Sequence, residues 1–258
     1  MIELKNKKVF LTGASSGIGY ALAKKLVKEG CIVSVIARRI DRLNELAAEL
    51  KGSGGKIYTY KGDITNIERM REITSEIENI SGGIDIAILN SGIGRPEGVD
   101  KFSSVYAAEI FGTNVIGMIK CIEVLLPIFI KQKGGVIAGV SSLADNRGYS
   151  GSGFYCSSKA AATIMLESLR IELKKFGVKI VTIKPGFVRS EMTARNKFKM
   201  PFLMNADKAA GIIIAGLTKE KRIIQFPLPT VIGAKIIGFL PGWLYEYLGK
   251  DKGIGNQG

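Results

Sequence analysis

The sequence predicts an α/β fold in which one domain is built around a doubly wound parallel sheet of about seven strands, with helices on both faces. Short apolar or β-branched runs alternate with longer stretches of periodic apolar residues along most of the 258 residues. This alternation is typical of parallel strands joined by right-handed helical crossovers. No internal repeat, low-complexity tract or linker divides residues 1–226, and residues 227–258 are expected to be an apolar extension of the same domain.

The individual elements follow from these runs in order. The first apolar strand ends at Leu11, and the helix after it carries apolar residues through Val27. A β-branched run at 31–37 predicts the second strand, and a Gly-Ser-Gly-Gly turn at 52–55 precedes the third. The later strands are predicted at 56–60, 84–89, 135–140, 178–183 and 222–226, and the later helices at 41–50, 66–80, 104–130, 152–176 and 206–218.

A glycine-rich turn joins the first strand to the first helix, with glycines at 13, 17 and 19. A strand, a glycine-rich turn and a helix N-terminus together can bind a pyrophosphate, because the backbone can approach closely and free N–H groups face the anion. The spacing is Gly-x3-Gly-x-Gly rather than the usual Gly-x-Gly-x2-Gly. A plain turn also explains such a run. The flanking strand and helix make it a nucleotide-site candidate in a Rossmann-type sheet.

Polar and turn residues follow most of the predicted strands. In doubly wound sheets, ligands bind beyond the C-terminal ends of the strands. Each of these residues could serve only as a turn or cap, but together they line one crevice and favour a cofactor site. They are Gly13, Arg38, Arg39, Asp63, Asn90, Ser141, Ser142, Pro185 and Gly186.

The chain contains no histidine, which excludes Ser-His-Asp and Cys-His hydrolysis and any metal site that needs imidazole. Proton transfer therefore falls to a carboxylate, lysine, tyrosine or cysteine with a displaced pKa. Tyr155 and Lys159 are four residues apart and share one helix face. A neighbouring ammonium can lower the pKa of a phenol from its usual value of about 10. Ser142 can hydrogen-bond a substrate carbonyl in the same crevice, although a Tyr/Lys pair at this spacing is also common as a purely structural feature.

These motifs together resemble the short-chain dehydrogenase/reductase family, from Lys8 to about Phe226. The matching segments are Thr12-Gly-Ala-Ser-Ser-Gly-Ile-Gly19, Gly62-Asp63, Asn90-Ser-Gly92, Asn114, Ser142, Tyr155-Cys-Ser-Ser-Lys159 and Pro185-Gly-Phe-Val188. There are two small departures from the family pattern. Ser91 replaces alanine and Ser190 replaces threonine, and both keep the size or the hydroxyl chemistry.

The resemblance implies a role for each matching residue. Tyr155 would be the general acid/base, Lys159 would lower its pKa and bind the nicotinamide ribose, and Ser142 would orient the carbonyl or alcohol. Asn114 would hold a water in a proton relay. The implied cofactor-binding residues are Gly13, Ser15, Ser16, Gly17, Ile18, Gly19, Arg38, Arg39, Asp63, Ile64, Asn90, Tyr155, Lys159, Pro185, Gly186, Val188 and Ser190. No metal is expected.

The end of the second strand predicts NADP(H) as the cofactor. A site selective for NAD places a carboxylate there to bind both ribose hydroxyls. This chain instead has Ala37 followed by Arg38 and Arg39. A guanidinium can pair with a 2′-phosphate, and no carboxylate repels it. The alternative is that the two arginines only begin a surface helix.

We expect an enzyme that reduces a carbonyl compound to an alcohol, or performs the reverse reaction. The segment 187–205, rich in methionine and phenylalanine, predicts an apolar lid with interleaved Lys197 and Lys199, and thus a lipid-like or acyl substrate; a loop packed on the core is the alternative. Within the enzyme class, a 3-oxoacyl-thioester reductase competes with a reductase of steroid-like or other lipid carbonyls. Outside it, a non-catalytic, redox-responsive NADP-binding scaffold remains, although the complete Ser, Tyr, Lys and Asn set favours the enzyme.

Charge and the C-terminal segment bear on partners and location. The net charge is +14, with thirteen Lys/Arg against four Asp/Glu from Arg170 to Arg222. A solvated basic face, an anionic membrane or an acidic substrate would each explain it, whereas nucleic acid is not expected. Residues 227–248 are apolar, include Trp243 and are interrupted by Pro227, Pro229 and Pro241. They predict a short interfacial helix or, equally, a tail packed in a homo-dimer or homo-tetramer.

The remaining composition predicts a cytoplasmic protein. No apolar segment precedes the first strand, so no signal peptide is expected. No uninterrupted apolar run reaches the ~18–20 residues of a membrane-spanning helix. The three cysteines are far apart and not in metal-binding spacing, which suits a reducing compartment.

Overall fold

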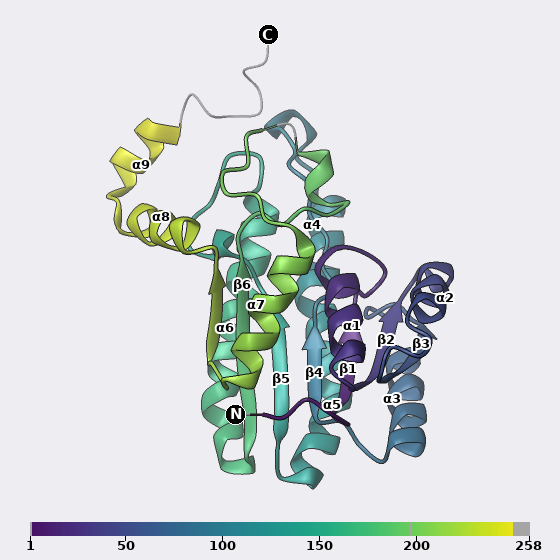
Figure 1. The fold of residues 1–258 in the computed structure, drawn as a ribbon. Helices are drawn as coiled ribbons and strands as arrows, with labels where there is room; N and C mark the ends of the chain where they lie inside the picture. Colours follow the sequence, from purple (N-terminus) through teal and green to yellow (C-terminus); the bar gives the residue numbers. More distant parts are fainter. Residues whose placement is uncertain (1, 197, 250–258) are drawn as a thin grey trace.

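The computed structural model describes residues 2–196 and 198–249, and its centre is a seven-stranded sheet in which every pairing is parallel. The strand order is β3-β2-β1-β4-β5-β6-β7 (Figure 1), so the predicted doubly wound fold is confirmed. The strands are β1 (Lys8–Thr12), β2 (Ile32–Ala37), β3 (Lys56–Lys61), β4 (Ile86–Leu89), β5 (Gly135–Val140), β6 (Val178–Pro185) and β7 (Ile223–Phe226).

Helices cover both faces of this sheet. Strand residues alternate between the two faces, as the period of two requires: Leu11 packs with one core cluster and its neighbour Phe10 with the other. On the first face lie α1 (Gly17–Lys28), α2 (Ile40–Glu49) and α7 (Ala206–Thr218). On the second lie α3 (Ile67–Ser81), α5 (Met118–Gln132) and α6 (Gly153–Glu172).

The predicted helix at 104–130 is not a single α-helix. It consists of α4 (Ser104–Phe111), a π-helical segment (Gly112–Gly117) and α5. Such π segments are frequent at functional sites, and this one carries Asn114. The whole stretch from 104 to 132 is long and apolar enough to cross a membrane by length and composition, although charged residues interrupt it, and half of its most apolar window is buried inside the protein. Its apolar residues therefore serve the core that α5 forms with α3 and the sheet.

Two further boundaries differ for identifiable reasons. β4 begins at Ile86 rather than at residue 84, because the backbone N–H and C=O of Ile84 bond to the Gln132 side chain (3.0 and 2.8 Å) instead of a neighbouring strand. β6 continues to Pro185, which pairs in register with Phe226 at the end of β7. These extra residues bring the Pro185-Gly186 turn next to the start of the C-terminal tail.

The described part of the tail forms two helices, α8 (Leu228–Phe239) and α9 (Gly242–Gly249), which stand at one side of the C-terminal end of the sheet (Figure 1). The prolines initiate these helices rather than interrupt them: Pro229 lies in the first turn of α8, and Pro241 directly precedes α9. The part of the predicted extension at 250–258, like Lys197 of the predicted lid, lies outside the described residues.

The tail is attached to the body mainly through Asn146 and Arg147. The Asn146 amide donates to the carbonyl of Ala234 in α8 (2.6 Å). Arg147 donates to carbonyls at the end of α8, including those of Ile237 and Leu240. Its guanidinium also lies 5.0 Å from the Tyr245 ring centre in α9. The tail is thus docked on the turn that follows the fifth strand, close to Ser142 in the sequence.

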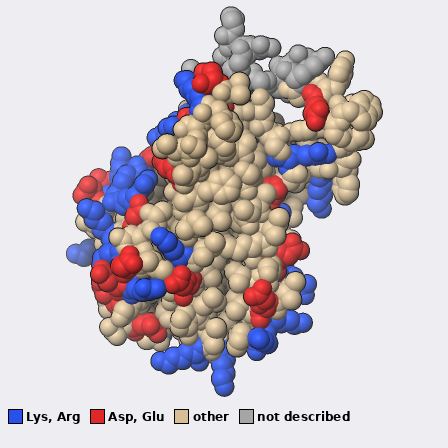
Figure 2. Space-filling model, turned by 180° about the vertical axis from the view of Figure 1, so that it is seen from behind, with Lys and Arg blue, Asp and Glu red and all other residues tan. Residues whose placement is uncertain are grey.

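Exposed isoleucines lie on the second face, on α6 and along the stretch that includes α5. Figure 2 views the molecule from this side and shows a largely uncharged centre, with Lys and Arg gathered along the lower edge. Single exposed apolar residues are ordinary on a surface, but several on neighbouring helices are typical of a contact face. The exposed isoleucines of this face are Ile116, Ile119, Ile164 and Ile171.

Candidate active site

The glycine-rich turn after β1 folds back on itself so tightly that side chains are excluded. Gly13 and Gly17 have positive φ angles of 70° and 56°, a conformation that L-residues rarely adopt. At Gly19, a Cβ would lie 2.3 Å from the carbonyl oxygen of Gly13. The three predicted glycines are therefore required by the close approach of the loop to the first turn of α1.

Asn90 and Thr12 fasten this turn to the end of β4. The Asn90 side-chain amide donates to the carbonyls of Thr12 and Gly13, both at 3.1 Å. In return, the Thr12 hydroxyl accepts from the backbone N–H groups of Asn90 (3.0 Å) and Ser91 (3.1 Å). Asn90, predicted to line the cofactor site, thus also fixes the loop that would hold the pyrophosphate.

The first turn of α1 is suited to an anion. The side chain of Ser16, at the N-cap, makes no capping hydrogen bond, and the first turn has no acidic residue. Its backbone N–H groups are therefore free of a side-chain cap at the positive end of the helix dipole. Ser190 packs against this point from the loop after β6, where a Cβ on Gly17 would lie 3.0 Å from its Cβ.

The two arginines after β2 lie where the sequence predicted them, but each has an acidic partner. Arg38 lies 3.7 Å from a carboxylate oxygen of Asp63. Arg39 pairs with Glu191 (2.8 Å), and its guanidinium also donates to the Ser15 hydroxyl (3.1 Å). Both arginines are exposed, at 70% and 44% of their side chains. Solvent screening keeps such pairs weak, so a stronger anion can displace the carboxylates.

Asp63 and Ile64 follow β3 but do different things. The second carboxylate oxygen of Asp63 accepts from the backbone N–H (2.9 Å) and hydroxyl (2.8 Å) of Thr65, which orients the side chain. Ile64 is buried in the core, and a Cβ on Gly117 of the π segment would lie 2.7 Å from its Cδ1. The Ile64 side chain therefore supports the crevice from behind.

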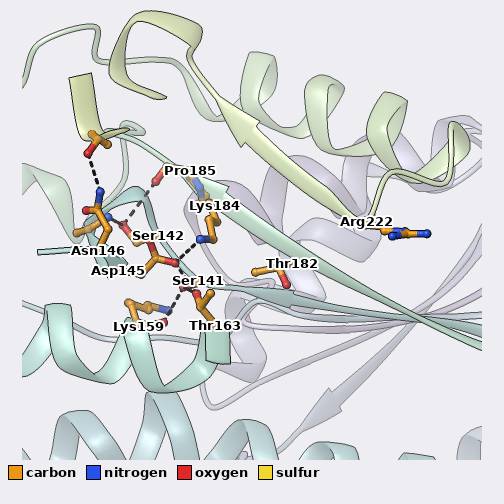
Figure 3. Close-up of polar contacts among 12 residues, drawn as sticks. Ser141, Ser142, Asp145, Asn146, Lys159, Thr163, Thr182, Lys184, Pro185 and Arg222 are labelled. Carbon is orange, nitrogen blue, oxygen red and sulfur yellow. Dashed lines mark hydrogen bonds and ion pairs between the residues drawn. The ribbon is translucent and has the colours of Figure 1, made fainter. Parts of the chain in front are cut away.

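Lys159 and Tyr155 of α6 approach the end of β5. Lys159 is 3% exposed, and its ammonium donates to the carbonyl of Val140 (2.9 Å), the residue before Ser141. Its Nζ lies 5.8 Å from the centre of the Tyr155 ring. Ser142 follows at the strand end, where its hydroxyl accepts from the N–H of Ala144 (3.1 Å) and lies 3.5 Å from the carbonyl of Pro185 (Figure 3).

The loop after β4 closes over these residues. A Cβ on Gly92 would lie 3.2 Å from both the Asn114 side-chain oxygen and Lys159 Nζ. A Cβ on Gly94 would lie 2.4 Å from the Tyr155 ring. A side chain at Gly94 would collide with the Tyr155 ring, and one at Gly92 would require its neighbours to shift slightly, so this loop lies within a few ångströms of Asn114, Lys159 and Tyr155.

Burial decides the protonation of the two titratable groups. It raises the pKa of Tyr155 above its usual value, and a hydrogen bond from Ser142 opposes part of that rise. Burial also lowers the pKa of Lys159 to about 8. Near neutral pH the phenol of Tyr155 is therefore protonated, which is the form required to give a proton to a carbonyl oxygen.

Asn114 is fully buried in the π segment and holds two neighbouring elements. Its side chain exchanges hydrogen bonds with the backbone of Ile93 (2.8 and 2.9 Å) and donates to the Ser158 hydroxyl (3.0 Å). Ser158 in turn donates to the carbonyl of Tyr155 (2.8 Å). Asn114 thus links the loop after β4 to α6, and its role in a proton relay stays a prediction.

The loop after β6 adds the remaining predicted residues. The N–H of Gly186 donates to Phe226 (2.7 Å), and Val188 is buried in the core. Beside Gly186, the buried Thr230 hydroxyl has no hydrogen-bond partner within residues 2–196 and 198–249. The uncapped α1 turn and this unpaired hydroxyl are polar groups at the same end of the sheet, and they fit a bound dinucleotide. No group of three His, Cys, Asp or Glu that could hold a metal occurs in that described part.

The sequence pattern did not predict three charged side chains that lie beside the site. Glu191 is one of few acidic residues in a basic segment, and its carboxylate pairs with Arg39. Asp145 and Lys184 form a buried pair behind Ser142 (2.7 Å). A lysine at the end of the apolar sixth strand and an aspartate three residues after Ser142 are unusual enough to note in the sequence. Because they are 39 positions apart, the sequence alone does not predict that they pair.

Comparisons with known proteins agree with this geometry. A family model described as short chain dehydrogenase matches residues 7–200. An uncharacterized oxidoreductase from Myxococcus xanthus is 33% identical over 246 residues, which cover 95% of this chain and 97% of that protein. Ketoacyl reductase HetN from Nostoc sp. is 31% identical over 204 residues, covering 79% of this chain and 71% of that protein.

The fold also matches a solved structure. The crystal structure of a short chain dehydrogenase/reductase from Burkholderia phymatum in complex with NAD superposes with a TM-score of 0.84. The match covers 91% of this chain and 94% of that one, at 20% sequence identity. At this identity the likeness bears on the fold alone.

Proposed function

The chain belongs to the short-chain dehydrogenase/reductase family of oxidoreductases, and we propose that it uses NADP(H) to reduce an apolar carbonyl compound to an alcohol or to catalyse the reverse reaction. The observation that carries the proposal is the convergence of Tyr155, Lys159 and Asn114 on Gly92 and Gly94. This cluster lies at the same end of the sheet as the glycine-rich turn, where ligands of doubly wound sheets bind.

The chain's own residues would act as follows. When bound, the nicotinamide nucleotide supplies or accepts the hydride. Tyr155 donates its phenolic proton to the carbonyl oxygen during reduction and takes it back during oxidation. The Ser142 hydroxyl orients that oxygen. The Lys159 ammonium stabilises the phenolate that forms, because an opposite charge nearby favours the charged form.

The preference for NADP(H) is supported by Arg38 and Arg39. A 2′-phosphate beside the ribose would present a doubly charged, bidentate acceptor to these guanidiniums. It would compete with Asp63 and Glu191, which hold the two arginines through exposed ion pairs. Because neither carboxylate is buried, exchanging it for a phosphate costs little desolvation.

The lid supports an apolar substrate. Phe198, Phe202 and Leu203 are 41%, 60% and 36% exposed, and Phe102, before α4, is 74% exposed. The loop between β6 and α7, which carries the first three, lies at the C-terminal end of the sheet (Figure 1). An apolar substrate would bury part of this surface on binding.

A 3-oxoacyl thioester is a second substrate candidate, favoured by the similarity to a protein named as a ketoacyl reductase. The test is a panel of carbonyl compounds, including a 3-oxoacyl thioester and steroid-like ketones, mixed with NADPH or NADH. We expect absorbance to report NADPH oxidation with at least one apolar ketone, and NADH to be at least about tenfold poorer. NADPH that binds but is not oxidised by any compound would support the non-catalytic scaffold instead.

We further propose a cytoplasmic homo-oligomer whose tail touches a membrane surface. The three cysteines are buried and free, which fits a reducing compartment. The exposed isoleucines of the second face provide a contact surface for a second copy. On the tail, Phe239 and Trp243 are 89% and 72% exposed, and aromatic side chains of this kind suit a membrane interface. A tail packed on a partner subunit is the rival.

A further inference from the structure

A buried ion pair lies directly behind the turn that carries Ser142. Lys184 Nζ, near the end of β6, is 2.7 Å from a carboxylate oxygen of Asp145. The Asp145 side chain is 4% exposed and that of Lys184 is 18% exposed. Well-packed apolar residues usually stabilise a protein as much as a buried ion pair does. The position of this pair therefore calls for a role other than stability.

Hydrogen bonds lead from the pair to the helix that carries the catalytic residues (Figure 3). The Thr163 hydroxyl of α6 lies 2.5 Å from the Asp145 oxygen that faces Lys184. The Thr163 and Ser141 hydroxyls are 2.7 Å apart, and Ser141 donates to the carbonyl of Lys159 (2.9 Å). The turn after β5 is therefore tied to α6 at two points one helical turn apart, by Asp145 at Thr163 and by Ser141 at Lys159.

We propose that Asp145 and Lys184 are positioning residues that hold Ser142 and α6 in register and keep the charge beside Tyr155 balanced. Tyr155 needs such balance because its ring is enclosed by the loop at Gly94, where a nearby charge is poorly screened. The inference rests on the proposed role of Tyr155 as the acid/base. It adds two residues to the site, neither of which touches the substrate.

Titratable groups from several elements influence the pKa of Tyr155. Among these groups, Cys156 and Asp145 raise the pKa of Tyr155 further, after burial, while Ser142 lowers it. The loop after β4 contributes the uncharged Gly94. Tyr155 lies near Cys156 and Lys159 of α6 and near Asp145 after β5. Asp145 in turn lies near Lys184 of β6 and Tyr149, and Tyr149 lies near Tyr245 of α9.

Breaking the pair from either side should move the pKa of Tyr155 in opposite directions. Asp145→Asn keeps an acceptor for Thr163 and removes the carboxylate charge that raises the pKa of Tyr155, which favours the phenolate. Lys184→Met leaves the Asp145 carboxylate uncompensated, which disfavours it. A merely structural role would loosen the turn in both variants and give no opposite shifts.

The direct measurement is an ultraviolet titration of the Tyr155 phenolate in the cofactor-free protein. In each background, the spectrum of the same protein carrying Tyr155→Phe is subtracted, so that only Tyr155 is followed. We expect a pKa lower by about one unit in Asp145→Asn and higher by about one unit in Lys184→Met. Loss of Tyr155 ionisation over the whole range in which circular dichroism shows a folded protein also counts as a rise. The double variant should return close to wild type.

Two controls separate charge from structure. Lys179→Met makes the same substitution on the same strand, in an exposed pair with Glu220, and should leave the Tyr155 titration unchanged. Thr163→Val breaks the hydrogen-bond chain without changing charge, and should lower turnover while shifting the pKa less than either charge variant. Shifts of the same sign in Asp145→Asn and Lys184→Met, or no shift in either, would overturn the inference.

The titration does not depend on turnover. A fully active Tyr155→Phe enzyme would therefore contradict the proposed function without affecting this result. As a second measurement, the pH dependence of kcat for alcohol oxidation should move with the titration, to lower pH in Asp145→Asn and to higher pH in Lys184→Met. If the pH profiles of Asp145→Asn and Lys184→Met coincide, the proposed role of the Asp145–Lys184 pair is wrong.

Discussion

At the ends of β1 and β4 the site is held by backbone groups and glycines, whereas at the ends of β5 and β6 it is held by charged side chains. In the first region, Asn90 and Thr12 exchange hydrogen bonds with main-chain atoms, and a Cβ at Gly19 has no room. In the second, Lys159, Asp145 and Lys184 act through their charges. The first region is therefore sensitive to shape, and the second to protonation.

The charged region should give the largest effect when Lys159 is replaced. In the cofactor-free protein, burial lowers the pKa of Lys159 to about 8, so its ammonium is present below that pH and is lost above it. Because we propose that the ammonium stabilises the phenolate formed during reduction, we expect wild-type NADPH oxidation to fall as the pH rises through about 8. Lys159→Met should lower the rate about 100- to 1000-fold and remove this transition. A pH profile of kcat measures both, and an unchanged transition would show that another group titrates.

The backbone region is tested by adding a single methyl group. Gly19→Ala forces the Gly13 carbonyl and the Asn90 amide to move, since a Cβ would lie 2.3 and 2.6 Å from them. A displacement of this size costs up to about 100-fold, here in NADPH affinity measured by fluorescence titration. The matched control is Gly211→Ala in α7, where the nearest atom to a new Cβ is 4.0 Å away. It should raise the free energy of unfolding by roughly 0.5–1 kcal/mol and leave NADPH binding intact.

Arg38 and Arg39 are exposed charged residues after β2, outside both regions. Replacing them should change NADPH binding less than the substitutions above. Replacing Arg38 and Arg39 by alanine should weaken NADPH binding by at least about tenfold, since a charge-assisted hydrogen bond contributes roughly 1.5–3 kcal/mol. NADH binding should hardly change. Glu191→Gln should have the opposite effect, because it frees Arg39, and should tighten NADPH binding by about two- to fivefold. Equal changes for NADH and NADPH would contradict the assignment of the 2′-phosphate site.

The sequence predicted the backbone region better than the charged one, for a physical reason. The positions of Gly13, Gly19 and Asn90 follow from short motifs whose local conformation leaves few alternatives. The Asp145–Lys184 pair brings together residues 39 positions apart, and Glu191 meets Arg39 across 152 positions. Such contacts depend on how β6 and its loop pack against the rest of the fold, which residue spacing alone does not fix.

Strands were predicted more accurately than helices. The predicted ends of the seven strands differ from the observed ones by two residues at most, because buried parallel strands are continuous apolar runs. The sequence did not predict the π segment around Asn114, because residues 112–117 lie between two apolar helical runs and nothing in their order marks a wider helical turn. The conformation there depends on the contacts that Asn114 makes with Ile93 and Ser158.

The smallest effect on turnover is expected at Phe239 and Trp243, two exposed side chains of the tail. Replacing Phe239 and Trp243 by serine removes two exposed apolar side chains and leaves the Asn146 and Arg147 contacts in place. Wild-type protein should bind anionic vesicles at low salt and less as salt rises, and the variant should bind markedly less. Ile80→Ser, which alters an exposed apolar residue on α3, is the control and should bind as wild type. A wild-type protein that ignores such vesicles, together with a variant of altered oligomer size, would favour the tail as a subunit contact.

We propose that Tyr155 transfers the proton, and a single substitution removes the group that carries it. Tyr155→Phe keeps the ring beneath Gly94 but removes the ionisable hydroxyl. We expect kcat for NADPH oxidation with the best carbonyl substrate of the panel to fall about 100- to 10,000-fold, while NADPH affinity stays within about twofold. Tyr149→Phe, at a neighbouring tyrosine outside the cluster, serves as the matched control and should retain most of the activity. A Tyr155→Phe enzyme that turns over at a near-normal rate would contradict the account.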